Sequence, residues 1–176
     1  GRLERKYESV RNNRTVDRLF VIAALSAQDA ASPSMLESMQ ITPQRLPTHA
    51  LLDWLQILKN LPGIAQREQH LQVVEQELRS RIMLTGGAVL FTTEKNDNWW
   101  WMMQNGDSNA ARLLLLTADL PSWHDDMGGL ASGLLARQKN GNWGTTTANI
   151  WGQLALRTFA QLHESEPVTG QLEASY

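Results

Sequence analysis

The residues best suited to acid–base or metal chemistry are His124, Asp125 and Asp126, which follow one another in the chain. An imidazole beside two carboxylates can in principle hold a cation. Consecutive residues on a helix, however, point about 100° apart, so these side chains do not converge on one ion. Acidic residues just after Ser122 also suit a helix N-terminus, where they complement the macrodipole. We expect helix-start stabilisation here, and we assign no catalytic residue, metal ligand or cofactor site to the chain.

Tryptophans form a second group with chemistry to offer. Three are consecutive, and on a strand the first and third would face one way and the second the other. Exposed tryptophans can stack on sugars or anchor a partner protein, whereas buried ones would plug a helical array and fasten a hairpin to it. We favour burial, and for Trp143 and Trp151 we favour core packing over a binding rim. The candidate interaction surface comprises Trp99, Trp100, Trp101, Asn142 and Trp143.

Composition excludes several functional classes. The chain has 176 residues, of which 42% are hydrophobic, which fits one globular domain. A net charge of -2 gives no reason to expect nucleic-acid binding, and the absence of cysteine excludes disulfides and thiolate chemistry within these residues. No apolar run is long enough to insert in a bilayer, and no leader is visible, which fits a cytosolic protein or a mature or excised piece.

Apolar residues at helical spacing predict about seven helices. These begin near residues 15, 35, 48, 64, 107, 122 and 146, and the last runs to His163. Segment 64–83 has the clearest amphipathic pattern. Between the helices, segments 88–93 and 99–103 read as two strands joined by a turn at 96–98, which predicts a β-hairpin insertion within 85–103.

Four helix starts share a hydroxyl placed before a small or apolar run: Thr15, Thr48, Ser108 and Thr147. They are separated by 33, 60 and 39 residues. A helix pair with its turns takes roughly 35 to 45 residues, so the first and last spacings fit one pair each. The middle spacing fits a pair plus the β-hairpin. We therefore predict a mainly α fold, an α/α-hairpin array that forms either an open solenoid or a partial toroid.

The array is expected to occupy most of the chain as one domain. Residues 1–14 are polar and charged and read as a lead-in or linker, and 15–165 form the array domain. Residues 166–176, which include Pro167 and Gly170, read as an exit linker to a following domain.

Residues 142–156 read Asn-Trp-Gly-Thr-Thr-Thr-Ala-Asn-Ile-Trp-Gly-Gln-Leu-Ala-Leu. This stretch resembles the end of the thioester-type α/α-toroid domain of bacterial alpha-2-macroglobulins. Segments 47–62, 97–102 and 107–113 resemble earlier parts of the same domain, so the likeness covers most of 15–170. Thioester members carry a Cys-x-Glu-Gln motif, which is absent here. The Thr-Thr-Thr-Ala-Asn form favours the branch of the family without a working thioester.

The resemblance implies a non-catalytic module of a large periplasmic protein, attached to or near the inner membrane. Such a protein traps or inhibits proteases that enter the cell envelope, so its partners would be proteases and envelope proteins. A complete toroid has more helices than this chain can hold, so the chain would form the C-terminal part of one.

Two alternatives remain open. An α/α toroid can also be a carbohydrate-active enzyme, in which two carboxylates flank the glycosidic bond. The candidates for such a pair are Asp97, Asp107, Asp125 and Asp126. The chain could equally be a scaffold that docks partner proteins in an envelope complex.

Overall fold

The computed structural model describes residues 2–95 and 103–164, with side chains from Arg14 onward. These residues form six α-helices and one antiparallel two-stranded sheet, which confirms the mainly α fold with a β-hairpin. The α-helices are α1 (Arg2–Ser26), α2 (Thr48–Asn60), α3 (Arg67–Arg81), α4 (Gly106–Thr117), α5 (Met127–Leu135) and α6 (Thr146–His163). The strands are β1 (Ile82–Thr85) and β2 (Ala88–Phe91), and the 3₁₀ helices are η1 (Pro33–Leu36), η2 (Pro43–Arg45) and η4 (Pro121–Asp126).

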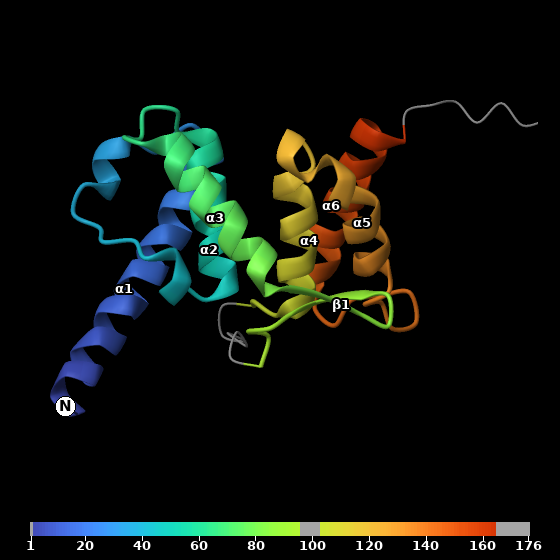
Figure 1. Cartoon of the computed structure of the whole chain (residues 1–176), viewed down its shortest axis with the longest axis horizontal. Helices are drawn as coiled ribbons and strands as arrows, with labels where there is room; N and C mark the ends of the chain where they lie inside the picture. The colour runs from blue at the N-terminus through green and yellow to red at the C-terminus, as the bar shows by residue number, and fades with distance from the viewer. Residues whose placement is uncertain (1, 96–102, 165–176) are drawn as a thin grey trace, which may run out of the picture.

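Four helices form a continuous row. α1 packs on α2, α2 on α4, and α4 on α6, while α3 lies against α2, and α5 against α4 and α6 (Figure 1). The row therefore consists of the four helices that the shared hydroxyl starts predicted. α2 and α4 lie in the middle of the row, and the residues of α2 from Thr48 to Leu55 are all buried. None of the described helices combines the length and the apolar character needed to cross a bilayer.

Helix boundaries differ from the sequence prediction at several places. α1 begins at Arg2, so Thr15 lies inside the helix and residues 2–14, expected as a lead-in, continue it. The segment near residue 35 forms the short 3₁₀ helix η1 instead of an α-helix. α3 ends at Arg81, because the next four residues leave the helix as β1. Residues 165–176, expected as the exit linker, lie outside the described part of the chain.

The predicted hairpin exists but pairs a different strand. β2 falls within the expected 88–93, yet its partner is β1, with Thr85 opposite Ala88 and Ile82 opposite Phe91. The turn is Gly86-Gly87, and both residues have positive φ (59° and 81°), as a type I′ hairpin requires. The prediction that β2 pairs with a strand at 99–103 was therefore wrong, because its partner is β1. Residues 99–102 themselves lie outside the described part.

A buried ion pair joins the two central helices of the row. Arg112 of α4 donates from Nη2 to Asp53 Oδ1 of α2 at 2.6 Å, and both side chains are almost fully buried. The pairing is incomplete, because Asp53 Oδ2 and Arg112 Nε are buried without a hydrogen-bond partner in the described structure. Because both charges are removed from water, the loss of either partner would leave the other charge buried and uncompensated.

We expect Asp53→Ala to lower the free energy of unfolding by about 3 to 5 kcal/mol, because it leaves the Arg112 charge buried and unpaired. The double variant Asp53→Leu, Arg112→Met should recover most of that loss, since it removes both desolvated charges and keeps apolar volume. Urea unfolding followed by circular dichroism measures each value. Losses that simply add in the double variant would show that the pair is not coupled.

Candidate functional site

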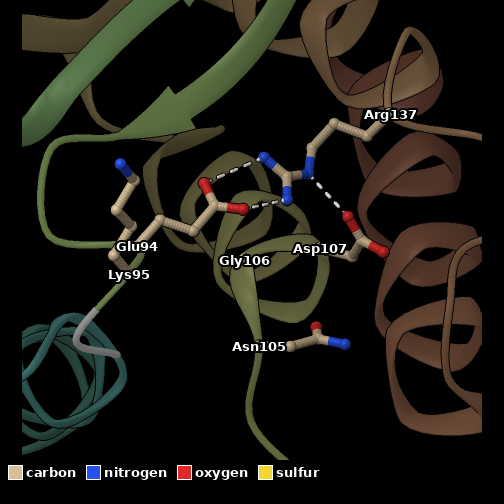
Figure 2. A pocket seen from close by; sticks show the side chains of 6 residues that line it. All are labelled: Glu94, Lys95, Asn105, Gly106, Asp107 and Arg137. Carbon is tan, nitrogen blue, oxygen red and sulfur yellow. Dashed lines mark hydrogen bonds and ion pairs between the residues drawn. The ribbon is translucent and has the colours of Figure 1, made fainter. Parts of the chain in front are cut away.

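Three segments far apart in the chain meet around one guanidinium. Glu94 follows β2, Asp107 lies in the first turn of α4, and Arg137 follows α5. Figure 2 shows Arg137 between the two carboxylates, at a hollow of about 330 Å³. We call this group of three residues the Arg137 junction. The hollow is also lined by Lys95, Asn105 and Gly106.

Every nitrogen of the Arg137 guanidinium has a partner. Nε donates to Asp107 Oδ1 at 2.7 Å, and Nη2 donates to Glu94 Oε1 at 2.5 Å. Nη1 donates to the Val89 carbonyl oxygen at 2.7 Å and to Glu94 Oε2 at 3.2 Å. Burial lowers the pKa of Arg137, but the hydrogen bonds that it donates to Glu94 and Asp107, with the attraction of their charges, outweigh burial, so the pKa lies above its ordinary value. Arg137 therefore stays charged and acts as a fixed cation.

The two carboxylates are bound further by main-chain amides. Phe91 N–H donates to Glu94 Oε2 at 3.2 Å, and Gly144 N–H donates to Asp107 Oδ2 at 3.0 Å. Each of the four carboxylate oxygens thus accepts a hydrogen bond from the protein. This arrangement suits a charged clamp that joins the hairpin, α4 and the loop before α6.

The clamp fixes the residue type at the start of α4. A Cβ on Gly106 would overlap Glu94 Oε1 and lie 2.5 Å from Arg137 Nη2. The helix is capped just before this position, because Asn105 Oδ1 accepts from Ser108 N–H at 2.8 Å and Ser108 Oγ accepts from Asn105 N–H at 3.0 Å. Ser108 is therefore part of a capping box inside α4, and not the residue before the helix as its spacing suggested.

The loop before α6 contains two of the residues predicted to form an interaction surface, Asn142 and Trp143. Lys139 and Asn142 pair across a two-residue turn, where Asn140 and Gly141 both have positive φ (54° and 77°). Asn-Gly is a favoured sequence for this turn. The turn leaves the side chain of Asn142 exposed. Trp99, Trp100 and Trp101, the other candidates for the interaction surface, lie outside the described residues.

Trp143 lies in the core, only 5% exposed. Its Nε1 donates to the Leu134 carbonyl oxygen at 3.0 Å, and its ring covers Gly152 of α6. Asn149 holds the loop from both sides, accepting from Trp143 N–H at 3.1 Å and donating to the carbonyl oxygens of Trp143 (2.8 Å) and Thr145 (2.7 Å). The indole of Trp143 therefore contributes to packing and not to the exposed surface.

Thr145 is the N-cap of α6, and its Oγ1 accepts from Ala148 N–H at 3.2 Å. Trp151 is half-buried, with its ring centroid 5.6 Å from the Arg112 guanidinium carbon. The hydroxyl residues and tryptophans of this stretch thus serve to start α6 and to pack it against its neighbours.

His124, Asp125 and Asp126 lie apart from the Arg137 junction. They end the 3₁₀ helix η4, and α5 begins directly after them. Asp126 pairs with Arg79 at 2.6 Å, while Asp125 is exposed. Ser122 does not cap α5; its hydroxyl donates to Glu75 Oε2 at 2.5 Å. The described residues contain no group of three side chains that could hold a metal ion.

Of the four acids considered for glycoside cleavage, Asp97 lies outside the described residues. Asp107 pairs with Arg137 and lines the same hollow as Glu94, whereas Asp125 and Asp126 line another hollow. Sequence reasoning missed Glu94 and Arg137, and no spacing could have indicated them, because 43 residues separate the two partners.

We expect Arg137→Ala to lower the free energy of unfolding by about 2 to 4 kcal/mol, because it leaves two half-buried carboxylates and the Val89 carbonyl without their donor. Arg157→Ala is the matched control, since Arg157 is exposed and makes no ion pair in the described structure, and it should change stability by less than about 0.5 kcal/mol. Equal effects in urea unfolding would refute the clamp.

Gly152→Ala should destabilise the chain by about 1 to 3 kcal/mol, because a Cβ would lie 2.6 Å from Trp143 Cη2 and 2.7 Å from Cε3 in a packed core. Gly128→Ala is the control: its Cβ meets no atom within 4 Å, and the gain in helix propensity should leave stability unchanged or higher by up to about 1 kcal/mol. Thermal unfolding measures both. If Gly152→Ala left the unfolding temperature unchanged, the Trp143 ring would not be packed tightly against position 152.

Comparisons of the chain with protein-family models, curated proteins and solved structures found no match.

Proposed function

We propose that the chain is a non-catalytic structural and interaction module of a periplasmic, alpha-2-macroglobulin-like protein that traps or inhibits proteases. The observation that carries this proposal is the role of the residues that resemble that family. Within 142–156, Trp143, Asn149 and Gly152 hold the loop against α6 through a buried ring and paired hydrogen bonds. A motif made of packing and capping residues fits an architectural domain better than an active site.

The two ends of the helix row support a role within a larger assembly of helices. On α1, at one end, Phe20 and Val21 are exposed, and on α6, at the other, Ile150, Leu154 and Leu162 are exposed. Terminal units of a helical array need a polar outer face when nothing covers them. Apolar residues at both ends are what a partial toroid, continued by further helices of the same parent protein, would have.

The charged residues also support a non-catalytic role. A glycoside hydrolase needs one carboxylic acid that can give up a proton beside a second carboxylate. At the Arg137 junction, each oxygen of Glu94 and Asp107 already accepts a hydrogen bond from Arg137 or from a main-chain amide, so neither acid is placed to act on a substrate. We therefore rank the carbohydrate-active alternative below the protease-trap module.

The proposal is tested with two proteins: this chain alone, and the full parent protein that contains it. We expect the chain alone to be helical by circular dichroism and not to slow cleavage of casein by an endopeptidase at equimolar concentration. The parent protein should slow casein cleavage but spare a short peptide substrate, because a sterically enclosed protease still admits small molecules.

Stoichiometric inhibition by the chain alone would contradict the proposed role, and so would a parent protein that inhibits neither substrate. Release of reducing sugar from a panel of oligosaccharides by the chain would favour the enzyme alternative instead.

A further inference from the structure

The two edges of the β-hairpin differ in how far their main-chain hydrogen-bonding groups are satisfied, and the proposed function makes no use of this difference. In a hairpin closed by two residues, the pairs Thr85–Ala88 and Met83–Leu90 exchange the hydrogen bonds. The bond from Thr92 N–H to the Arg81 carbonyl oxygen, 2.8 Å, continues the same alternation. The main-chain groups of Ile82 and Leu84 on β1, and of Val89 and Phe91 on β2, therefore point outward.

The outer edge of β2 is closed by the chain itself. Arg137 Nη1 donates to the Val89 carbonyl oxygen, and the Phe91 N–H donates to Glu94 Oε2. The Phe91 carbonyl oxygen accepts from Glu94 N–H at 3.0 Å. Three of the four outward groups of β2 thus have partners, so no further strand can pair there.

The outer edge of β1 is open. The Ile82 N–H is used by the end of α3, where it donates to the Arg79 carbonyl oxygen. The Ile82 carbonyl oxygen and both main-chain groups of Leu84 have no partner in the described structure. The strand is apolar and exposed, with Met83 at 42% and Leu84 at 66% of full exposure. An uncovered apolar edge of this kind is a template for another strand.

A groove of about 420 Å³ runs beside this open edge. Ile82 and Leu84 line it, together with Trp123 and Leu130, and successive strand residues alternate faces, so the groove lies on the Ile82 and Leu84 face of the hairpin. Gly129 of α5 also lines it, and a Cβ at Gly129 would meet nothing within 4 Å, so this wall of the groove is open because it has no side chain.

The rim of the groove carries surplus negative charge. Arg79 stacks on the Trp123 ring at 3.9 Å and pairs with Asp126 at 2.6 Å, so those two charges balance. Asp125 also lines the groove, is exposed, and forms no ion pair among the residues that the structure describes. A basic side chain on a ligand would complement it.

We propose that β1 and this groove bind an extended peptide segment of a partner protein, which adds to the hairpin as a third strand. The partner residue opposite Leu84 would exchange both main-chain hydrogen bonds with it and place an apolar side chain in the groove between Trp123 and Leu130. A Lys or Arg next to that residue would pair with Asp125. This site stands whether or not the parent protein traps proteases.

The test uses this chain immobilised as bait and a phage-displayed library of random nine-residue peptides. We expect enriched peptides with apolar residues at alternate positions and a flanking Lys or Arg. Their synthetic forms should bind Gly129→Leu at least about tenfold more weakly, because the new side chain fills the groove. Gly128→Leu is the matched control, because position 128 has the same helix and the same open space but does not line the groove, and its affinity should be unchanged.

Two further variants test the other parts of the site. Leu84→Pro removes the outward N–H without removing a hairpin hydrogen bond and should also weaken binding about tenfold. Asp125→Asn should weaken only the peptides that carry the basic residue. In hydrogen exchange followed by NMR, the Leu84 amide should become protected on binding, while the Met83 amide, already bonded within the hairpin, should change little.

Absence of any enriched peptide would overturn the proposal. Peptides that bind Gly129→Leu and Leu84→Pro as tightly as the unaltered chain would overturn it too, since they would occupy another surface.

Discussion

The burial of one arginine constrains the arrangement of half the chain. A guanidinium with 8% of its side chain exposed needs partners for all its donors, and Arg137 finds them on the hairpin, on α4 and in the turn after β2. The same carboxylates then position Gly144 and Phe91 through their amides. The start of α4, the edge of β2 and the loop before α6 are thus all set by the charge at one point (Figure 2).

The second buried cation is satisfied less completely. Arg112 has one strong bond to Asp53, while its Nε, the second Asp53 oxygen and the side-chain amide of Asn109 are buried without partners in the described structure. Such a contact contributes little net stability, but it permits few alternative alignments of α2 on α4. The two arginines therefore have different physical roles: Arg137 joins segments, and Arg112 selects the alignment of two helices.

Periodicity predicted the parts of the fold that burial determines. The apolar spacing of α2 and α6 located both helices, because an amphipathic face must follow the helical repeat. The pattern failed at β1, where Ile82, Met83 and Leu84 extend the apolar character of α3 although the chain has already turned into a strand. Gly86-Gly87 and the polar residues 96–98 were both acceptable turns, and only the pairing distinguishes them. The Arg137 junction could not be predicted from the sequence pattern, because an ion pair between distant segments has no sequence period.

The loop around Trp143 closes over short distances along the chain. Apart from the Gly144 amide, which donates to Asp107, the bonds made by Trp143 and Asn149 join residues four to nine positions apart, from Asn149–Thr145 to Trp143–Leu134, whereas Arg137 and Glu94 are 43 positions apart. The entropy lost on closing a chain segment grows with the logarithm of its length, so closing the longer one costs roughly 1.4 kcal/mol more than closing the nine-residue one. The bonds of Trp143 and Asn149 can therefore form with little help from the rest of the molecule, while the charged clamp, which also holds Gly144, depends on the remainder of the chain being in place.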